Sequence, residues 1–207
     1  MITIESVKNW IFDLDKIYNE QKLYLSELDS AIGDGDHGVN LARGFDTVKS
    51  QWEKTPPADL ASAFKLISMA LIKSVGGSAG PLYGTFFMRG GLVLANKNET
   101  GLDEWIEVLD KGIAGIVMMG KAQKGDKTML DALYPALEAL QKAKSEGKTF
   151  ADALKASFEA AETGMKDTIP LLAKKGRASY LGERSIGHQD PGATSSAMLL
   201  KSASQFF

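Results

Sequence analysis

Apolar residues along this chain recur at steps of three and four, the spacing of one helix face rather than the alternation of a strand. The first segment with this pattern contains Val7, Trp10, Ile11, Leu14, Ile17 and Tyr18, and it extends to the Asp29 region. Similar segments follow at 41–52, 60–75, 81–94, 105–117, 130–140, 149–165 and 191–204. The pattern predicts an all-α protein with about eight helices, and no run of residues demands a strand.

Residues typical of helix ends support these bounds. Pro56 stops the second helix, because the residue before a proline is disfavoured in helical geometry. Asp59 and Thr149 are suited to cap the third and seventh helices, and Pro81 stands at a favoured first-turn position. Pro170 follows the seventh apolar segment and is expected to kink or split that helix.

The connections between the helices are unusual. No repeat or long linker divides the chain, so we expect one domain over residues 1–207, folded as a helical bundle. Helix connections are mostly short and unspecialised, yet several here are rich in Gly, Asp, Ser and His. If the helices alternate up and down, every second connection falls at the same end. We therefore expect convergence at one rim of the segments 29–38, 76–81, 120–128 and 176–191.

Composition narrows the range of functions. The chain has 207 residues, a formal net charge of -2 and no cysteine. The charge does not favour a polyanion, so nucleic acid is not an expected partner. Without cysteine, disulfides, thiolate metal sites and a cysteine nucleophile are excluded. The N-terminus lacks the pattern of a signal peptide and no apolar stretch is long enough to span a bilayer, so we expect a cytoplasmic protein.

The segment 29–38 has the most informative chemistry. It places the carboxylates of Asp29, Asp34 and Asp36 among glycines, which let the backbone fold tightly. Oxygen ligands favour magnesium or calcium over zinc, and a magnesium site completed by phosphates suits this set. An EF-hand is excluded, because the glutamate that it requires would fall at Phe45. The alternative is a solvated turn in which Asp36 caps the next helix.

Three further connections offer groups for anions. The glycine-rich segment 76–81 opens a helix and fits either a phosphate cradle or a simple turn. The segment 120–128 is a near miss to a Walker A loop, and no strand precedes it, so anion contact and a charged turn both stay open. The long polar stretch 174–190 supplies cations, and the guanidinium of Arg177 is suited to phosphate. His188 alone points to no role.

Four strings of residues together resemble a known family. They are Gly33–Gly38, Val75–Phe87, Gly125–Met129 and Gly176–Ala193, and in this order they are similar to the nucleotide-binding L subunits of bacterial dihydroxyacetone kinases. The similarity extends from the first helix to the last, and the final string is long and specific. The resemblance implies an eight-helix antiparallel barrel with the nucleotide site in the loops at one end.

The resemblance also implies a role for individual residues. Asp29, Asp34 and Asp36 would hold two magnesium ions that bridge the nucleotide phosphates. The nucleotide would be bordered by His37, Gly38, Val39 and Asn40, with Ser78 and Ala79 against the phosphates and Gly120 and Met129 at the adenine. The site would be closed by Arg177, Asp190, Pro191 and Gly192. Arg177 would stabilise charge in the transition state, and we expect no general base, since phosphoryl transfer depends on positioning and neutralisation.

Cofactor and partners follow from the same resemblance. In the branch with separate subunits, ADP stays bound and cycles to ATP. A phosphohistidine carrier of the phosphotransferase system, the M subunit, would phosphorylate it. The γ-phosphoryl would then pass to dihydroxyacetone held covalently on a histidine of the K subunit.

Other functions stay open at this point. The alternatives are a kinase domain of the same fold that exchanges ATP and acts with another partner, and a non-catalytic module that docks on a transcription regulator. Metal-dependent hydrolysis of a nucleotide is a third.

Overall fold

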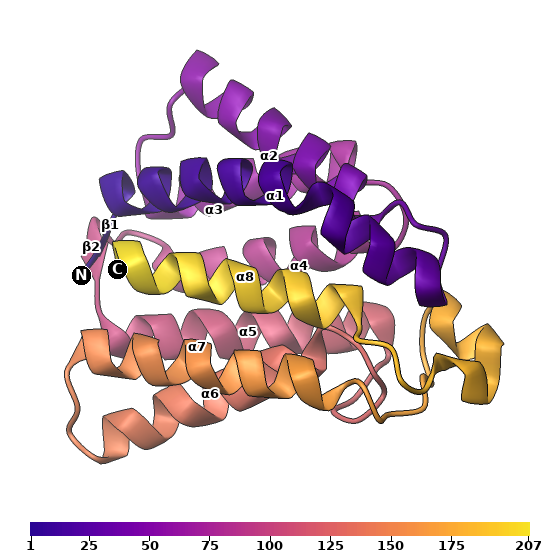
Figure 1. The fold of residues 1–207 in the computed structure, drawn as a ribbon. Helices are drawn as coiled ribbons and strands as arrows, with labels where there is room; N and C mark the ends of the chain where they lie inside the picture. The colour runs from indigo at the N-terminus through magenta and orange to yellow at the C-terminus, as the bar shows by residue number, and fades with distance from the viewer.

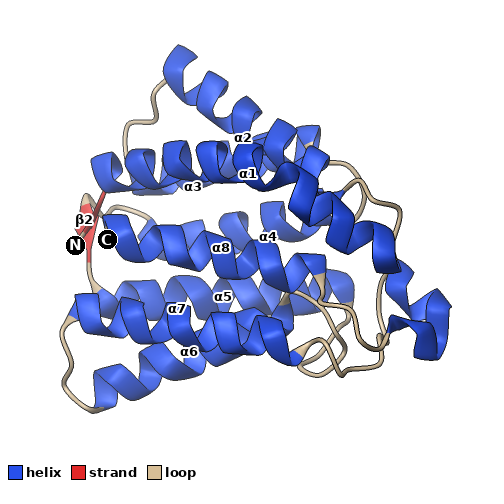
Figure 2. Cartoon of the chain, in the orientation of Figure 1, coloured by secondary structure: helices blue, strands red, loops and turns tan.

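The computed structural model describes all 207 residues and contains eight α-helices, which confirms the all-α prediction (Figures 1 and 2). The helices are α1 (Ile4–Ile32), α2 (His37–Lys54), α3 (Leu60–Ser74), α4 (Ala79–Gly91), α5 (Leu102–Gly120), α6 (Leu130–Ser145), α7 (Phe150–Asp167) and α8 (Pro191–Phe206). Two 3₁₀ segments, η1 (Leu92–Leu94) and η2 (Arg177–Ser185), and two short strands, β1 (Ile2–Thr3) and β2 (Glu99–Thr100), complete the chain.

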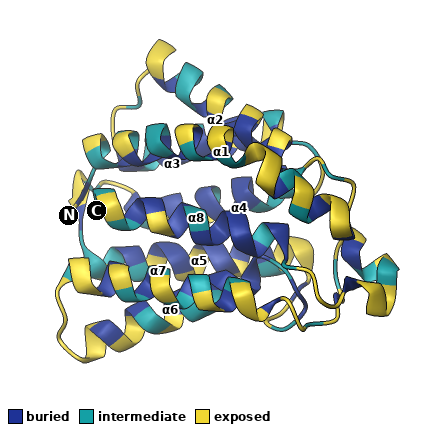
Figure 3. Ribbon diagram, in the orientation of Figure 1, coloured by how far each residue is buried: buried dark blue, intermediate teal, exposed yellow.

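The helices form a closed antiparallel barrel. Each helix packs against the next one in the sequence, and α8 returns to pack against α1. The buried residues face the inside of this ring and form one large apolar cluster (Figure 3). Aromatic rings fill part of it, because Trp10 lies 5.8 Å from Phe87 and 5.9 Å from Trp105 between ring centroids. Burial of the apolar helix faces is therefore what closes the barrel.

Two buried polar side chains fix α1 against α8. The indole nitrogen of Trp10 donates to the carbonyl of Leu199 at 3.1 Å, and the hydroxyl of Tyr18 donates to the carbonyl of Ser195 at 2.8 Å. Buried polar groups need such partners, because an unpaired one loses its hydration without compensation. These bonds set the axial position of α8, whose N-terminus lies at the loop end of the barrel (Figure 1).

A close contact between α6 and α7 depends on a proline and a glycine. Pro135 lies inside α6 and has no N–H, so it cannot donate to the carbonyl of Asp131 one turn earlier. This carbonyl lies directly against Gly164 of α7, where a Cβ would overlap it. Glycine is therefore needed at this crossing for steric reasons.

The prediction of no strand is wrong at one place. Ile2 pairs with Thr100 and Thr3 with Glu99 in an antiparallel pair at the end of the barrel that holds both termini (Figure 1). The amino group of Met1 also donates to the carbonyl of Phe207 at 2.9 Å. Strands of two residues are too short to show an alternating pattern, so no periodicity marks them in the sequence.

The expected effect of Pro170 is also wrong. Helix α7 ends at Asp167, so Pro170 lies beyond it and neither kinks nor splits it. The carbonyls of Thr168 and Leu171 accept hydrogen bonds from the side chain of Lys127, and the chain turns there instead of continuing the helix. None of the eight helices combines the length and the apolar character needed to cross a bilayer.

Candidate functional site

The four unusual connections meet at one end of the barrel, as expected from their alternation. They line a common pocket at the right-hand end of Figure 1, between the ends of α1, α3, α5 and the loop before α8. The sequence-predicted residues on its wall are Asp29, Asp34, Asp36, His37, Asn40, Ser78, Ala79, Gly120, Met129, Arg177, Asp190, Pro191 and Gly192. Gly38 and Val39 are not on this wall.

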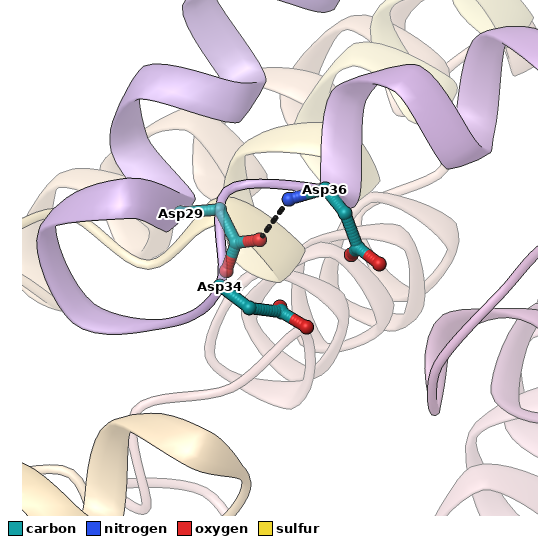
Figure 4. A group of neighbouring side chains, drawn as sticks. All are labelled: Asp29, Asp34 and Asp36. Carbon is teal, nitrogen blue, oxygen red and sulfur yellow. Dashed lines mark hydrogen bonds between the residues drawn. The ribbon is translucent and has the colours of Figure 1, made fainter.

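The side chains of the three aspartates lie together (Figure 4), and all three line the pocket. One carboxylate oxygen from each of Asp29, Asp34 and Asp36 lies within 4.8 Å of the others. Asp29 is in the last turn of α1 and Asp36 stands at the N-cap of α2, while Gly35 between them has φ 77°. The side chain of Asp36 makes no capping hydrogen bond. Asp36 therefore occupies the N-cap position that the alternative expects, but its side chain does not cap α2.

Hydrogen bonds orient Asp29 for this cluster. Its Oδ2 accepts from the backbone N–H of Asp36 at 3.0 Å, the dashed line in Figure 4, and from that of His37 at 3.1 Å. Burial raises the pKa of Asp29, the N–H of His37 lowers it, and the charge of Asp34 raises it again. A cation would relieve this crowding of negative charge, and an all-oxygen donor set fits magnesium.

Arg177 comes from a distant part of the chain to the same cluster. It opens η2, and its Nη2 lies 3.0 Å from Oδ2 of Asp34. The side chain of Arg177 is 66% exposed, so this ion pair is accessible to solvent. An exposed pair contributes little to stability. Its significance is that it holds a guanidinium at the mouth of the pocket.

The N-terminus of α4 forms another part of the wall. Gly77 has φ 63°, which favours glycine, and Ser78 at the N-cap makes no side-chain capping bond. The first N–H groups of a helix have no intrahelical acceptors and carry a partial positive charge. Asn40 of α2 lies against Gly76, where a Cβ would come within 3.0 Å of its side chain. This turn therefore presents N–H donors and an amide to the pocket.

His37 is held within a buried hydrogen-bond chain. Its Nε2 lies 2.9 Å from Oγ of Ser195, which in turn lies 2.7 Å from the hydroxyl of Tyr83. Burial lowers the pKa of His37 to about 4, so the ring is neutral near pH 7. Of its neighbours on α2, Gly38 packs against the carbonyl of Lys22 and Val39 is 49% exposed. Their contact with a nucleotide stays a prediction.

The opposite wall is formed by the start of α6 and of α8. Met129 at the N-cap of α6 is buried, and Gly192 comes close enough to it that a Cβ would lie 3.6 Å from its own. Oδ2 of Asp190 accepts from the N–H of Ala193 at 2.6 Å and so caps α8. Burial raises the pKa of Asp190 to about 7. Asp190 and Gly192 therefore position the N-terminus of α8 at the pocket.

Several pocket residues were not singled out from the sequence. Leu82 and Ile116 give the wall apolar surface, and Tyr83 supports it from behind through Ser195. Their spacing marked them only as helix-face residues, and no sequence signal separates a pocket wall from a core. Lys127 was noticed only as part of a basic loop, yet it is fully buried beside the pocket.

Comparison with known proteins agrees with this geometry. The model of the DAK2 domain matches residues 31–205, which is most of the chain. The chain belongs to the DAK2-domain family. The resemblance noted in the sequence is thereby confirmed at the level of the family.

Named relatives lie within the same family. The chain is 44% identical over 190 residues to the ADP-binding subunit DhaL of PEP-dependent dihydroxyacetone kinase 2 from Listeria innocua, covering 91% of this chain and 88% of the relative. It is 40% identical over 195 residues to the ADP-binding subunit DhaL of the PEP-dependent dihydroxyacetone kinase from Escherichia coli, covering 94% and 93%. In both, the match extends over nearly the whole of each chain.

A solved structure shares the fold. The crystal structure of the dihydroxyacetone kinase from C. freundii in complex with AMP-PNP and Mg2+ superposes with a TM-score of 0.72 and 29% identity. The match covers 98% of this chain and 33% of the kinase chain, so the DAK2-type chain spans about a third of that protein. The all-helical barrel is therefore confirmed as the fold of this family.

Proposed function

We propose that this chain is the ADP-binding subunit of a dihydroxyacetone kinase driven by phosphoenolpyruvate, with residues 1–207 acting as one nucleotide-binding domain. The observation that carries the proposal is the cluster of three carboxylates at the mouth of a pocket formed by four loops. The relatives named as ADP-binding subunits support it, since they match this chain over nearly their full length.

The carboxylates would hold two magnesium ions. Asp29, Asp34 and Asp36 supply three negative charges, and bound magnesium would neutralise phosphate charge and fix the phosphates for transfer. Asp29 is already oriented by two N–H donors, so the cluster is preorganised on the chain itself. Arg177 would add positive charge at the mouth, where charge develops on the phosphoryl group.

The remaining wall would orient the nucleotide. The N–H groups at Ser78 and Ala79 suit the phosphates, and the apolar surface near Gly120 and Met129 suits the adenine. Nε2 of His37 lies 2.9 Å from Oγ of Ser195, so the ring would serve to shape the wall beside the phosphates. No side chain in this arrangement is needed to attack or to remove a proton, because positioning and neutralisation carry phosphoryl transfer.

Partners complete the reaction. A phosphohistidine carrier, the M subunit, would phosphorylate the retained ADP, and the γ-phosphoryl would pass to dihydroxyacetone on the K subunit. The product would be dihydroxyacetone phosphate. The open mouth of the pocket beside Arg177 is where both partners would have to approach. We expect this exchange to take place in the cytoplasm.

A second candidate is a domain that exchanges free ATP. The specific observation in its favour is the similarity to the C. freundii kinase solved with AMP-PNP and Mg2+. Purification in magnesium buffer, desalting, denaturation and chromatography of the released nucleotide separates the two. Near-stoichiometric ADP supports the carrier-driven reaction, whereas an empty protein that exchanges ATP freely supports the second candidate.

The site itself is tested by a double variant. Asp34→Asn/Asp36→Asn removes two carboxylates from the cluster and should abolish retention of both nucleotide and magnesium. The matched control is Asp46→Asn/Asp110→Asn, which removes two exposed carboxylates elsewhere on the barrel and should retain both. Normal nucleotide and metal content in the first variant would show that the cluster is not the binding site.

A further inference from the structure

Lys127 is a buried cation with an unusual set of partners. Its side chain is 1% exposed, and its Nζ donates to four backbone carbonyls. These belong to Thr168 at 2.9 Å, Ile169 at 3.4 Å, Leu171 at 3.1 Å and Ser185 at 2.7 Å. A buried ammonium needs such compensation, because its desolvation is costly when it is left unpaired.

The four carbonyls lie on both sides of one long loop. Three belong to the stretch that follows α7 and one to the end of η2, so the ammonium of Lys127 ties the two ends of the segment 172–184 together. We call the place where residues 168–171 meet Ser185 the neck of the loop. Two further hydrogen bonds reinforce the neck: the N–H of Gly187 donates to the carbonyl of Ile169 at 2.8 Å, and the N–H of Ala173 donates to Oγ of Ser185 at 3.0 Å. Arg177 lies within the loop that this neck closes.

The loop has little apolar burial of its own. Only Ala173 and Ala178 are buried from the segment 172–184 as apolar residues, and they form a small cluster with Ile32 at the end of α1. A few small apolar side chains contribute little to holding the loop in place. Hydrogen bonds therefore do much of this work, those of Lys127 at the two ends of the loop and that of the Lys174 N–H to the carbonyl of Asp126 at 3.1 Å.

The backbone of Lys127 is itself strained. Its φ is 63°, a left-handed conformation that is unfavourable for a residue with a long side chain. Such a conformation persists only where the surroundings enforce it. It aims the side chain of Lys127 inward, toward the carbonyls, while Lys124 of the same loop points out to Glu138 at 2.8 Å.

We propose that Lys127 is a positioning residue, which holds the loop 172–184 so that the guanidinium of Arg177 stays at the carboxylate cluster. The inference rests on the proposed binding of a magnesium nucleotide at that cluster. Lys127 acts from behind the wall, through the carbonyls of the neck, and Arg177 is the group that reaches the mouth of the pocket.

The first test measures the loop directly. Trypsin can cut after Lys174, Lys175, Arg177 and Arg184, which all lie in or beside the loop. In Lys127→Met, which keeps an apolar stem without the ammonium, cleavage at these sites should become at least about tenfold faster because the neck is lost. The control Lys124→Met removes an exposed lysine three positions away and should leave the cleavage rate unchanged.

The second test measures coupling to Arg177. Affinity for Mg-ADP, measured by calorimetry on chains freed of their retained nucleotide, should fall about tenfold in Lys127→Met, in line with loss of one charged contact. In an Arg177→Met background the same change should lower affinity less than about twofold, because the residue that Lys127 positions is already gone. Equal losses in both backgrounds, or unchanged cleavage and affinity, would overturn the proposal.

A second variant tests the proposal if Lys127→Met does not fold. Ser185→Ala keeps the carbonyl but removes the bonds of Oγ to the N–H of Ala173 and the carbonyl of Gly182. It should raise loop cleavage and show the same dependence on Arg177, and the absence of both effects overturns the proposal. If the wild-type chain bound no Mg-ADP, the proposed function would fail, while the cleavage rates would still decide the role of Lys127.

Discussion

Asp29 performs two separable tasks, and two substitutions divide them. Its Oδ2 accepts from two backbone N–H groups and so shapes the turn into α2, while its charge belongs to the carboxylate cluster. Asp29→Asn keeps an oxygen acceptor and removes the charge. Asp29→Ala removes both. The two variants should therefore agree in ligand binding and differ in stability.

The expected changes in the free energy of unfolding follow from the distances between the carboxylates and from the hydrogen bonds of Asp29. Two unit charges 4.8 Å apart repel by about 1 kcal/mol in water and by about 3.5 kcal/mol at an effective dielectric of 20. Removing the charge of Asp29 relieves this repulsion but weakens two hydrogen bonds, so Asp29→Asn should stay within about 1 kcal/mol of wild type. In Asp29→Ala both N–H groups lose their acceptor, and after the relieved repulsion we expect a loss of about 2 kcal/mol.

Urea denaturation with and without Mg-ADP provides the assay. Ligand at 100 times its dissociation constant should stabilise wild type by about 2.7 kcal/mol. Neither variant should gain this stabilisation, because the cluster has lost a carboxylate. Wild-type stabilisation of Asp29→Asn by Mg-ADP would refute the role of the charge. Equal stability of the two variants would refute the role of the hydrogen bonds.

Two predictions concern the barrel itself. Mainly through its hydrogen bond with Lys97, the pKa of Glu104 is lowered from 4.5 to about 2. Since the ion pair is accessible to solvent, Glu104→Gln should cost about 1 kcal/mol at neutral pH, and the gap from wild type should close as pH falls from 4.5 to about 2 in denaturation curves. Gly164→Ala should lower stability by about 1–3 kcal/mol in thermal unfolding, because its Cβ would overlap the carbonyl of Asp131. An unchanged or higher midpoint would contradict this steric reading, since alanine has the better helix propensity.

The helices could be predicted because each has a continuous apolar face. Eight segments repeat the spacing of three and four over many residues, and burial in the barrel core follows that spacing. The pair β1 and β2 could not be predicted, because two residues cannot show a period. The prediction that Pro170 kinks or splits α7 was wrong for a related reason. A proline indicates that a helix does not continue, but not whether the helix has already ended before it.

The carboxylate cluster could be predicted because its residues are close in the sequence. Asp29 lies in the last turn of α1, Asp34 and Asp36 follow within seven residues before α2, and the glycines beside them indicate a tight backbone. To predict that the other three connections lie at the same end of the barrel, one further assumption was needed, namely that successive helices alternate in direction. Leu82 and Tyr83 were not predicted to line the pocket, because an inward-facing helix residue looks the same in the sequence whether it faces the core or a pocket.

The burial of Lys127 and its contacts could not be predicted for a different reason, which is the distance of its partners along the chain. Its acceptors lie 41 to 58 residues away, and they are backbone carbonyls, so their residue types carry no trace of the contact. A lysine in a polar loop is usually exposed, and the two interpretations left open for this loop, anion contact and a charged turn, both place Lys127 at the surface. Groups that touch a ligand form local motifs, whereas groups that hold those motifs in place are defined only by the fold. The sequence therefore marked the loop that carries Arg177 as a source of cations, whereas only the structure shows the buried ammonium that joins its two ends.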